Sequence, residues 1–426
     1  MKAIGIDIGT TSICGILLDT QSGEVLRSYT ENSDAFLNSC APWEKIQSVE
    51  KILAVALDIL ERLKTEGADV IGVTGQMHGI LYFDASANPV SPLYTWQDER
   101  GNLPYKDTTY ARYLGSSSGY GNVTDFYNRE NGLRPKNAVG YCTIHDYFVM
   151  RLCGLKMPVV HASDAASLGC YDLLRHRFDY DYDVEITTEF KLAGEYDGIP
   201  VSVAIGDNQA SVFSALASED DVLLNVGTGS QVSLISDAPV AAENIETRPY
   251  FDGKYLIVGS ALCGGRAYSV LKNFYSEILS YIEPTDDDTV YRMMNQMLEQ
   301  IHTSSLLVDT RFAGTRSNAE LCGSISGITT ENFRPPQLTL GVLEGMAREL
   351  FDMYQMMKSK KCGIVGSGNG IRKNAALVKM FEEKFDAKMK IPKHLEEAAY
   401  GAALFGAVAG GIYRDAKEAQ EHIKYE

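Results

Sequence analysis

Short apolar runs alternate with glycine-containing turns through the first third of the chain. Apolar residues fill 3–7 and 12–18, and a Gly-Thr-Thr turn lies between them, so the pattern predicts two strands joined by a tight turn. Apolar positions then recur at helical spacing over 46–63, and a buried strand is predicted over 70–74. This order of elements predicts an α/β domain whose functional loops leave the strand ends.

The same succession returns in the second half of the chain. Strands are predicted over 222–226 and 231–235, and a Gly-Thr-Gly turn joins them. A strand, a turn with glycine and threonine, and a second strand at two distant places indicate two related halves. A chain of 426 residues also exceeds what one hydrophobic core commonly holds. We therefore expect two domains, residues 1–203 and residues 204–426.

The other segments have weaker patterns. The stretch 98–137 is rich in Tyr, Gly, Asn and Ser, and we expect a surface excursion with short helices there. The charged tail after residue 414 is expected to fray. Further elements are predicted as a strand over 201–205 and helices over 210–216, 338–357, 373–385 and 396–409.

The composition excludes several classes of partner and location. The formal net charge is −17, which repels nucleic-acid phosphates and anionic membranes. No apolar run is long enough to cross a bilayer, and the N-terminus has no signal-peptide core. The 8 cysteines are scattered, without a C-x-x-C pair or a zinc-ligand spacing, as expected of free thiols in a reducing compartment. We expect a cytoplasmic protein that binds neither nucleic acid nor membrane.

The two glycine-containing turns are candidate phosphate sites. Glycine lets a ligand approach bare backbone, so successive N–H groups converge on phosphate oxygens while neighbouring hydroxyls add donors. Either turn alone is more simply explained as a tight hairpin. Their equivalent places in two halves favour phosphate binding by Gly9, Thr10, Thr11, Ser12, Gly227, Thr228, Gly229 and Ser230.

Two aspartates stand at the ends of predicted strands. Asp7 lies within an apolar strand, where it either binds Mg²⁺ beside nucleotide phosphates or caps its own turn. Asp207 lies at a strand-to-helix junction, where it either caps the helix or accepts a proton from an attacking hydroxyl. Because the chain has two candidate phosphate turns, we favour the role of catalytic base for Asp207.

Two loops of the first half carry the side chains of a sugar site. An aromatic ring covers the C–H face of a sugar, while mixed donors and acceptors reach its hydroxyls. A single histidine is more often structural, and an Asp-Arg pair two residues apart is more often a surface ion pair. Because both loops follow strands of the same half, we favour a sugar pocket made by Gln76, Met77, His78, Trp96, Asp98 and Arg100.

A glycine-rich run at 366–370 follows a short apolar strand and precedes a helix. Its sequence, GSGNG, lacks the G-x-G-x-x-G spacing of a dinucleotide fingerprint. The run fits either an adenosine that lies on glycine backbone or a helix start capped by Asn369.

Six motifs, in order, resemble those of one family. They are DIGTTS at 7–12, GQMHG at 75–79, WQDER at 96–100, GDNQAS at 206–211, NVGTGS at 225–230 and GSGNG at 366–370. On these motifs nearly the whole chain is similar to the FGGY carbohydrate kinases, which belong to the actin/Hsp70/hexokinase-like ATPases. The resemblance implies two ribonuclease-H-like α/β domains with ATP and a sugar in the cleft between them.

The resemblance also implies roles for residues at matching positions. Asp207 is expected to be the catalytic base, Asp7 and Asp207 to lie beside Mg²⁺, and Asn208 to join the sugar pocket. The segment 312–316 resembles a loop of the family's second domain. ATP and Mg²⁺ are the expected cofactors, a small sugar is the expected partner, and a homodimer is left open. Phosphate is expected at Gly227, Thr228 and Gly229, and adenosine at Gly366, Ser367, Gly368 and Asn369.

Within the family, GDNQAS, CGGR at 263–266 and GIRKN at 370–374 look most like sedoheptulokinases and next like xylulokinases. The first hypothesis is therefore an ATP-dependent kinase for a terminal hydroxyl of a ketose, with sedoheptulose ahead of xylulose. Two other classes are an ATP-driven machine of the actin or Hsp70 kind and a polyphosphate hydrolase. Neither class needs the two sugar-pocket loops.

Overall fold

The structure, a computed structural model, describes residues 1–315, 318 and 320–426. Its contacts divide the chain into two compact units. Unit 1 holds Met1–Ala217, Arg248–Tyr255 and His394–Lys424, and unit 2 holds Ser218–Thr247, Leu256–Lys393 and Tyr425–Glu426. The units are interleaved along the chain, whereas the sequence predicts one division at residue 203. The domain boundary at residue 203 therefore stays a prediction from the sequence.

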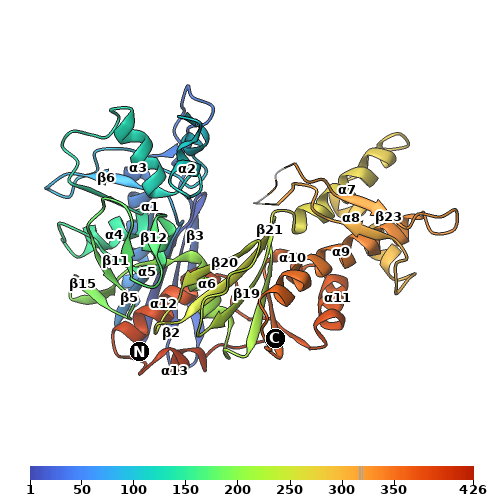
Figure 1. The fold of residues 1–426 in the computed structure, drawn as a ribbon. Coiled ribbons are helices and arrows are strands. Elements are labelled where there is room, and N and C mark those ends of the chain that lie inside the picture. Colours follow the sequence, from blue (N-terminus) through green and yellow to red (C-terminus); the bar gives the residue numbers. More distant parts are fainter. Residues whose placement is uncertain (316–317, 319) are drawn as a thin grey trace. The chain divides into compact units, whose positions relative to one another are not determined.

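A seven-stranded sheet forms the centre of unit 1 (Figure 1). Its strands run in the order β15 (Leu192–Tyr196), β16 (Ile199–Ser202), β5 (Val70–Gly75), β1 (Lys2–Ile8), β2 (Ser12–Asp19) and β3 (Glu24–Asn32), and β17 (Ile205–Gly206) pairs with the end of β5. β1 and β5 are parallel, and β1, β2 and β3 form an antiparallel meander. β1 is apolar on both faces, as expected of a strand covered on both sides.

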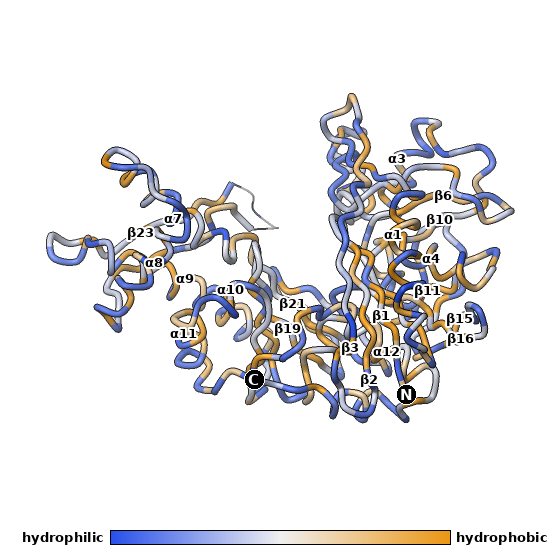
Figure 2. Tube along the Cα trace, turned by 180° about the vertical axis from the view of Figure 1, so that it is seen from behind, coloured by the Kyte–Doolittle hydropathy of each residue, from blue (hydrophilic) through white to orange (hydrophobic). Residues whose placement is uncertain are grey.

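Helices pack closely on this sheet because glycines stand where they cross it. A Cβ on Gly5 of β1 would lie 1.9 Å from the carbonyl oxygen of Ala399 in α12 (Glu397–Ala409). A Cβ on Gly72 of β5 would lie 1.8 Å from that of Ala402. Figure 2 shows hydrophobic residues along β1, β2 and α12. α6 (Asp207–Ala215) packs beside α12, and α1 (Val49–Lys64) packs on β2.

The remaining elements of unit 1 are mostly short. Two of them, α4 (Ile144–Leu152) and α5 (Ala162–Ser167), have buried polar side chains. The others are β4 (Ile46–Gln47), β6 (Leu81–Phe83), β7 (Leu93–Tyr94), η1 (Arg100–Asn102), β8 (Pro104–Tyr105), β9 (Thr108–Thr109), α2 (Tyr110–Tyr113), α3 (Gly121–Glu130), β10 (Gly140–Cys142), β11 (Val159–His161), β12 (Tyr171–Asp172), β13 (Arg177–Phe178), β14 (Glu185–Thr187) and α13 (Ala416–Gln420).

Unit 2 is built on a six-stranded sheet in the order β20 (Ile245–Pro249), β21 (Tyr255–Ala261), β19 (Ser230–Ser236), β18 (Asp221–Val226), β24 (Gly363–Ser367) and β25 (Met389–Lys390). β18 is antiparallel to β19 and parallel to β24. α9 (Pro335–Met356) packs on β19 and on β22 (Leu307–Asp309). α7 (Gly265–Ser280), α8 (Asp287–Leu298) and α11 (Ala375–Phe385) also pack against α9. β23 (Ser324–Ser326) pairs with β22, and α10 (Asn369–Arg372) packs on β18 and β24.

The two sheets share one arrangement of strands. The order β3-β2-β1-β5 in unit 1 is repeated as β21-β19-β18-β24 in unit 2. In both, a central strand is antiparallel to the next strand of the chain and parallel to a later one. A glycine- and threonine-containing turn joins the antiparallel pair in each unit. The predicted α/β class and the predicted repeat are confirmed.

The charged tail is docked, so the prediction that it frays is wrong. The Tyr413 hydroxyl donates to the carbonyl oxygen of Thr20 at 2.6 Å, and the Gln420 amide donates to that of Leu216 at 2.6 Å. The apolar side of α13 also buries Ala419. Buried side chains, the Tyr413 ring and the Gln420 amide, therefore hold this charged segment against the rest of unit 1.

Two further sequence predictions differ from the structure. The strand predicted over 201–205 is divided into β16 and β17, which pair with different parts of β5. The excursion over 98–137 has the predicted short helices, but α3 is largely buried. Its Asn122 and Asn128 bond to the surrounding chain, which explains why polar residues mask this burial in the sequence.

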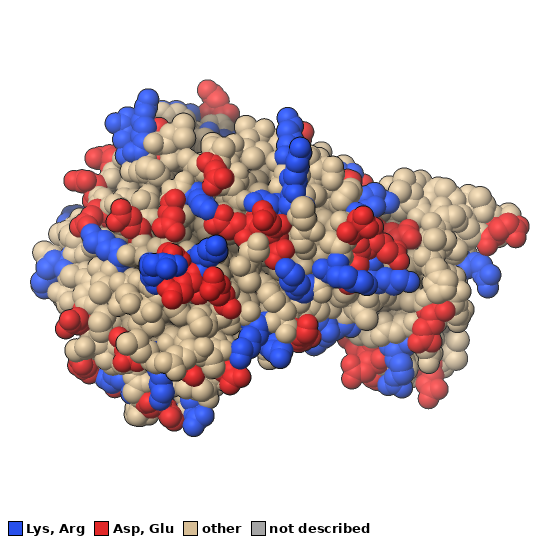
Figure 3. All heavy atoms as spheres, turned by 90° about the horizontal axis from the view of Figure 1, so that it is seen from below, with Lys and Arg blue, Asp and Glu red and all other residues tan. Residues whose placement is uncertain are grey.

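The surface carries mixed charges on the face that Figure 3 shows, and the cysteines are free thiols, as the sequence predicts. Figure 3 shows acidic and basic side chains interspersed over the face in view. All eight cysteines are free. Among the helices of the described residues, none has both the length and the apolar composition needed to cross a membrane.

Candidate active site

Asp7 and Asp207 lie at neighbouring strand ends in unit 1. Asp7 belongs to β1, and Asp207 is the first residue of α6, directly after β17. Gly75, at the end of β5, pairs with Ile8 on one side and with Gly206 on the other. The sheet register therefore brings together the two aspartates that the sequence predicts at strand ends.

Both carboxyl groups hold protons more tightly than ordinary aspartates. Burial, followed by the nearby Asp207 charge, raises the pKa of Asp7 to about 7. Burial also raises the pKa of Asp207 to about 6, although His145 and Arg248 oppose that shift. A carboxylate with a pKa near neutrality is matched to accepting and releasing a proton. Asp7 Oδ1 is buried and has no hydrogen-bond partner among the described residues, so it has a lone pair for a cation or a water.

A buried ionic cluster stands next to these aspartates and is not evident from the sequence. His145 Nε2 lies 2.9 Å from Asp164 Oδ1, and both side chains are fully buried. Asp146 follows His145 in α4, and its carboxylate accepts from the Thr143 hydroxyl at 2.7 Å. The side chains of His145, Asp146 and Asp164 each offer an atom within 4.8 Å of the others, a spacing suited to holding a proton or a cation.

The first glycine turn is tied to the acceptor loops by a chain of polar side chains. The Trp96 indole N–H donates to Thr10 Oγ1 at 2.9 Å, and Thr10 in turn donates to Gln76 Oε1 at 3.3 Å. The Gln47 amide donates to the Thr10 carbonyl at 2.6 Å and accepts from Gln76 Nε2 at 3.0 Å. Gln76 is buried, while Trp96 is 46% exposed. The structure thus brings Gln76 and Trp96 to Thr10, as a shared site requires.

His78 and Met77 complete the loop after β5. His78 has a φ of 76°, and its ring stacks on Tyr120 with centroids 4.3 Å apart. Its Nδ1 lies 2.8 Å from the Ser167 carbonyl oxygen, which only accepts, so Nδ1 carries the proton. Met77 packs against Gly206, where a Cβ would lie 2.7 Å from the Met77 sulfur. The loop is therefore fixed in place directly beside Asp207.

Asp98 and Arg100 are brought to the same region, but their polar atoms are already engaged. Arg100 donates from Nε to Asp98 Oδ1 at 2.6 Å and from Nη2 to Asp98 Oδ2 at 3.1 Å. It also bonds Asn128 and Glu44, and its side chain is 1% exposed. Asp98 Oδ2 further accepts from the Lys45 N–H at 3.0 Å. This pair fixes the loop that carries Trp96, a role the sequence did not indicate.

Asn208 lies next to Asp207 and is held by an arginine. Arg248 Nη1 donates to Asn208 Oδ1 at 3.0 Å. The positive charge of Arg248 also opposes the burial effect on the pKa of Asp207. Arg248 is remote in the chain and matches no motif, so the sequence analysis missed it.

The predicted nucleotide residues of unit 2 lie side by side. β18 and β24 are adjacent, and Asn225 Nδ2 donates to Ser367 Oγ at 2.7 Å. Gly368 has a φ of 82°, and a Cβ there would lie 2.6 Å from the carbonyl oxygen of Val226. Only glycine fits this contact, so the run 366–370 is pressed against the strand that leads into Gly227.

A second glycine pair supports the turn at 227–229. Gly265 N–H donates to the Gly227 carbonyl at 2.8 Å, and Arg266 N–H donates to that of Thr228 at 3.1 Å. A Cβ on Gly264 would lie 2.2 Å from the Gly229 carbonyl oxygen. Gly264 and Gly265 lie after β21, at the start of α7. Two glycines where a strand leads to a helix are therefore the feature of the sequence that could have indicated this contact with the turn at 227–229.

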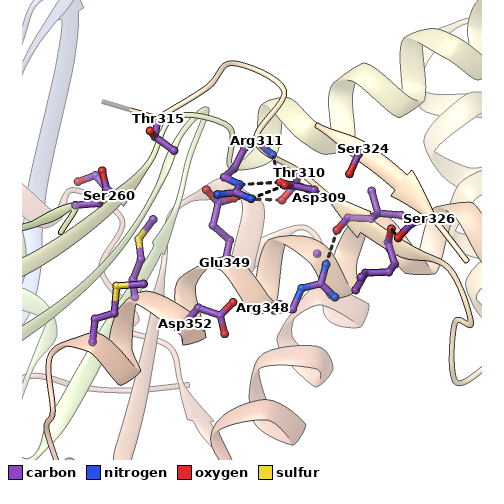
Figure 4. Close-up of a pocket in the computed structure, with 16 residues that line it drawn as sticks. Ser260, Asp309, Thr310, Arg311, Thr315, Ser324, Ser326, Arg348, Glu349 and Asp352 are labelled. Atoms are coloured by element: carbon purple, nitrogen blue, oxygen red, sulfur yellow. Dashed lines mark hydrogen bonds and ion pairs between the residues drawn. The ribbon is translucent and has the colours of Figure 1, made fainter. Parts of the chain in front are cut away.

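A pocket of about 360 Å³ lies elsewhere in unit 2, between β22 and α9 (Figure 4). Figure 4 shows the Arg311 guanidinium turned to Asp309, which it bonds at 2.9 and 2.5 Å. Burial raises the pKa of Glu349 in this pocket to about 7. Thr315, from the predicted loop 312–316, lines the pocket, whereas Arg316 lies outside the described residues.

The structure therefore gathers the predicted residues into two groups, one in each unit. The first group has Asp7, the turn Gly9–Ser12, the loops at 76–78 and 96–100, and Asp207 with Asn208. The second has the turn 227–229 and the run 366–369. Residues that sequence reasoning missed beside them are Gln47, His145, Arg248, Gly264, Gly265 and Glu396, whose charge acts on Asp7.

Solved structures define the class of this fold. A xylulose kinase from Lactobacillus acidophilus superposes with a TM-score of 0.85 at 18% identity, covering 100% of this chain and 92% of that one. A glycerol kinase from Plasmodium falciparum, solved with ADP, gives a TM-score of 0.77 at 15% identity, over 99% and 92% of the two chains. The fold is that of the actin/hexokinase-like sugar kinases.

Sequence comparison identifies the family within this class. Residues 2–106 match the N-terminal domain, and residues 222–410 the C-terminal domain, of the FGGY family of carbohydrate kinases. The chain belongs to this family and is an ATP-dependent sugar kinase. It is 29% identical to the sedoheptulokinase of Mus musculus over 94% of this chain and 96% of that protein. It is 24% identical to the xylulose kinase of Staphylococcus xylosus over 98% and 93%.

Proposed function

We propose that this sugar kinase transfers the γ-phosphoryl of ATP to the terminal hydroxyl of a ketose, and that sedoheptulose is its substrate. The sedoheptulokinases of Mus musculus and Homo sapiens, at 29% and 28% identity over nearly their whole length, support this choice. Xylulose is the second candidate, supported by the xylulose kinase of Staphylococcus xylosus. The geometry of the site supports a polyhydroxylated acceptor, and the relatives' names support the particular sugar.

Asp207 is the proposed base. Its carboxyl group stands at the N-terminus of α6, and its pKa of about 6 leaves it ionised at neutral pH while it retains basicity. A base of this kind accepts the proton of the sugar hydroxyl as that oxygen attacks phosphorus. Arg248 and His145 stabilise the ionised form before the proton arrives. The observation that carries the proposal is the placement of Asp207 directly after Gly206, on which Met77 of the 76–78 loop packs.

The acceptor pocket is proposed from the residues that bond to Thr10. Trp96 offers an exposed aromatic face, and Gln76 bonds to Thr10. Met77 packs on Gly206, directly before Asp207 and Asn208, and His78 follows Met77 in the same loop. Asp98 and Arg100 support this pocket by fixing the Trp96 loop, because their charges already satisfy one another. Direct sugar contact by Asp98 or Arg100 would require that pair to open.

We propose that two turns bind the phosphates of ATP and that a glycine-rich run binds its nucleoside. The turns at 9–12 and 227–229 have backbone and hydroxyl donors for phosphate, and the run 366–369 has glycine backbone for adenosine. Asp7, with its unpartnered Oδ1, fits Mg²⁺ together with Asp207. Bound Mg²⁺ supplies neutralisation of phosphate charge. The chain's own residues align the donor, hold the acceptor hydroxyl and take its proton.

A substrate panel tests the proposal. Purified protein with Mg-ATP is assayed for ADP release with sedoheptulose, xylulose, ribulose, fructose and glycerol, and the phosphorylated product is identified by mass. We expect the highest kcat/KM for sedoheptulose. A higher kcat/KM for xylulose would show that xylulose is the substrate and would leave the proposed kinase mechanism unchanged. ADP formation that no sugar stimulates would instead favour an ATP-driven machine or a phosphatase-type activity.

A further inference from the structure

His145 packs at the end of β5, next to the strand ends that carry Asp7 and Asp207. A Cβ on Gly75 would lie 3.2 Å from the His145 Cβ, so His145 packs directly on this glycine. Gly75 pairs with Ile8, which follows Asp7, and with Gly206, which precedes Asp207. The glycine at this register leaves space for the histidine beside both strand ends. The favourable electrostatic effect of His145 on both aspartates agrees with this placement.

The groups around His145 keep its ring protonated. Burial alone lowers the pKa of the imidazole, but the Asp164 carboxylate at 2.9 Å, with Asp146 and Asp207, raises it to about 9. His161 provides a contrast one element away. It is equally buried, but burial lowers the pKa of this histidine to about 4, so it is neutral. The acidic neighbours of His145 therefore decide its charge.

The partner of His145 is also connected to the base through the backbone. Asp164 follows Ser163 in α5, and Ser163 Oγ accepts the Gly206 N–H at 3.0 Å. Gly206 is the residue directly before Asp207. The ion pair between α4 and α5 thus fixes the serine that holds the backbone in front of the base.

We propose that His145 is a positioning residue that places a positive charge on Gly75, beside the strand ends of Asp7 and Asp207, and, through Asp164 and Ser163, fixes the backbone from which Asp207 projects. This inference rests on the proposed role of Asp207 as base. Asp164, Asp146 and Asp207 act on the His145 ring, and the ring in turn acts on Asp7 and Asp207. Burial, followed by the Asp164 charge, raises the pKa of Asp146 to about 8. Without the cation, two reacting carboxylates at adjoining strand ends would repel one another in a region of low dielectric constant.

A divalent cation bound by His145, Asp146 and Asp164 is the competing use of the same three side chains. Metal ligation needs a neutral imidazole with a lone pair on the coordinating nitrogen. A positioning charge needs both ring nitrogens protonated. The state of this one ring therefore separates the two uses.

Variants test the need for charge. His145→Gln removes the charge, and we expect kcat to fall about 100-fold with both KM values changed less than about threefold. His145→Lys restores a cation, and we expect kcat within about tenfold of the unchanged enzyme. Equal kcat for the two variants would overturn the proposal. His422→Gln is the control, because it removes a histidine that stacks on Tyr413 in the C-terminal segment, and little effect on kcat is expected.

The comparison with Asp207→Asn keeps the two proposals distinguishable. If Asp207→Asn loses activity and both His145 variants keep full kcat, the base assignment stands and the positioning proposal fails. If Asp207→Asn keeps its activity, the base assignment itself fails.

A measurement on the unchanged protein does not depend on whether variants fold. In long-range ¹H–¹⁵N spectra at pH 7.5, we expect the assigned His145 ring to show both nitrogens protonated, and to keep both protons when Mg²⁺ or Zn²⁺ is added. A neutral ring at pH 7.5 would overturn the proposal. A ring nitrogen that loses its proton on addition of equimolar metal would overturn it in favour of the metal site.

Discussion

The indole N–H of Trp96 donates to Thr10 Oγ1 at 2.9 Å, and this bond joins the proposed wall of the sugar pocket to the first phosphate turn. A sugar that packs on the Trp96 ring is therefore positioned relative to Thr10, the same residue that is proposed to hold phosphate. The two functions share one threonine, so disturbing either loop is expected to affect the binding of both substrates.

Replacement of Trp96 by Phe keeps an aromatic face and removes the N–H donor. Loss of one hydrogen bond of about 1 kcal/mol is expected to raise KM for the sugar about fivefold, and KM for ATP also rises. Steady-state kinetics with each substrate varied in turn measure both values. Trp43→Phe is the control, since Trp43 contacts Tyr127 and Arg100 rather than Thr10. A change in the sugar KM alone would contradict the shared role of Thr10.

Replacement of Asp207 by Asn removes the base with almost no change of shape. We expect kcat to fall about 10³-fold while the sugar still binds, because proton acceptance is needed only in the reacting complex. Single-turnover assays with calorimetric measurement of sugar binding test this. Retention of more than about a tenth of kcat would remove the base assignment.

The pH dependence follows from the shifted pKa of Asp207. The base is protonated below about 6, so kcat/KM is expected to decline as the pH falls through that value. The same shift has the opposite effect on stability. The folded state binds this proton more tightly than the unfolded chain does, so this group adds stability as the pH falls from about 6 towards 3.8. Activity lost at pH 5.5 without a drop in Tm fits this account, whereas a flat profile contradicts it.

Replacement of Gly75 by Ala tests the seat of His145. The added Cβ would lie 2.8 Å from the Ile8 carbonyl oxygen and 3.2 Å from the His145 Cβ, so one of them must move. We expect a loss of about 1–3 kcal/mol in the free energy of unfolding and a fall in kcat. Gly132→Ala is the control, because nothing lies within 4 Å there and only its positive φ carries a cost. Unchanged kcat and stability in Gly75→Ala would show that the seat is not tight.

Replacement of Arg100 by Lys separates a supporting role from direct sugar contact. Lysine cannot make the paired bonds to Asp98, so we expect stability to fall by about 2 kcal/mol. In a supporting role, Arg100 affects the sugar KM only through the Trp96 loop, so we expect a small rise in this KM that accompanies the loss of stability. Arg129→Lys, at a half-exposed arginine, is the control for stability. A large rise in sugar KM at unchanged Tm would instead indicate direct contact.

The sequence contained enough information for the fold class and for selecting candidate site residues that the structure brings together in two groups. Strand periodicity and the two glycine turns predict the paired sheets, because apolar strands and tight turns depend on local chemistry. The same local signals predict Asp7 and Asp207, which stand at strand ends. These predictions needed only the residues next to each motif.

Other parts of the site depend on contacts between residues remote in the chain. Asp98 and Arg100 have the composition of a sugar pocket, yet Asn128 and Glu44 complete a buried network around them. His145 lies within an ordinary helix, and its charge comes from Asp164, a residue of another element. Arg248 reaches Asn208 across forty residues of chain. No short pattern records such pairings, so sequence reasoning does not reach them.

The docking of α12 on β1 and β5 has a consequence for how the protein is made. The helix that fills the spaces above Gly5 and Gly72 comes far later in the chain than the strands beneath it, so it leaves the ribosome long after them. The nascent sheet must therefore wait, with an uncovered apolar face, until residues 397–409 have been synthesised. Stalled or truncated chains that end before residue 394 are expected to expose that face and to depend on chaperones.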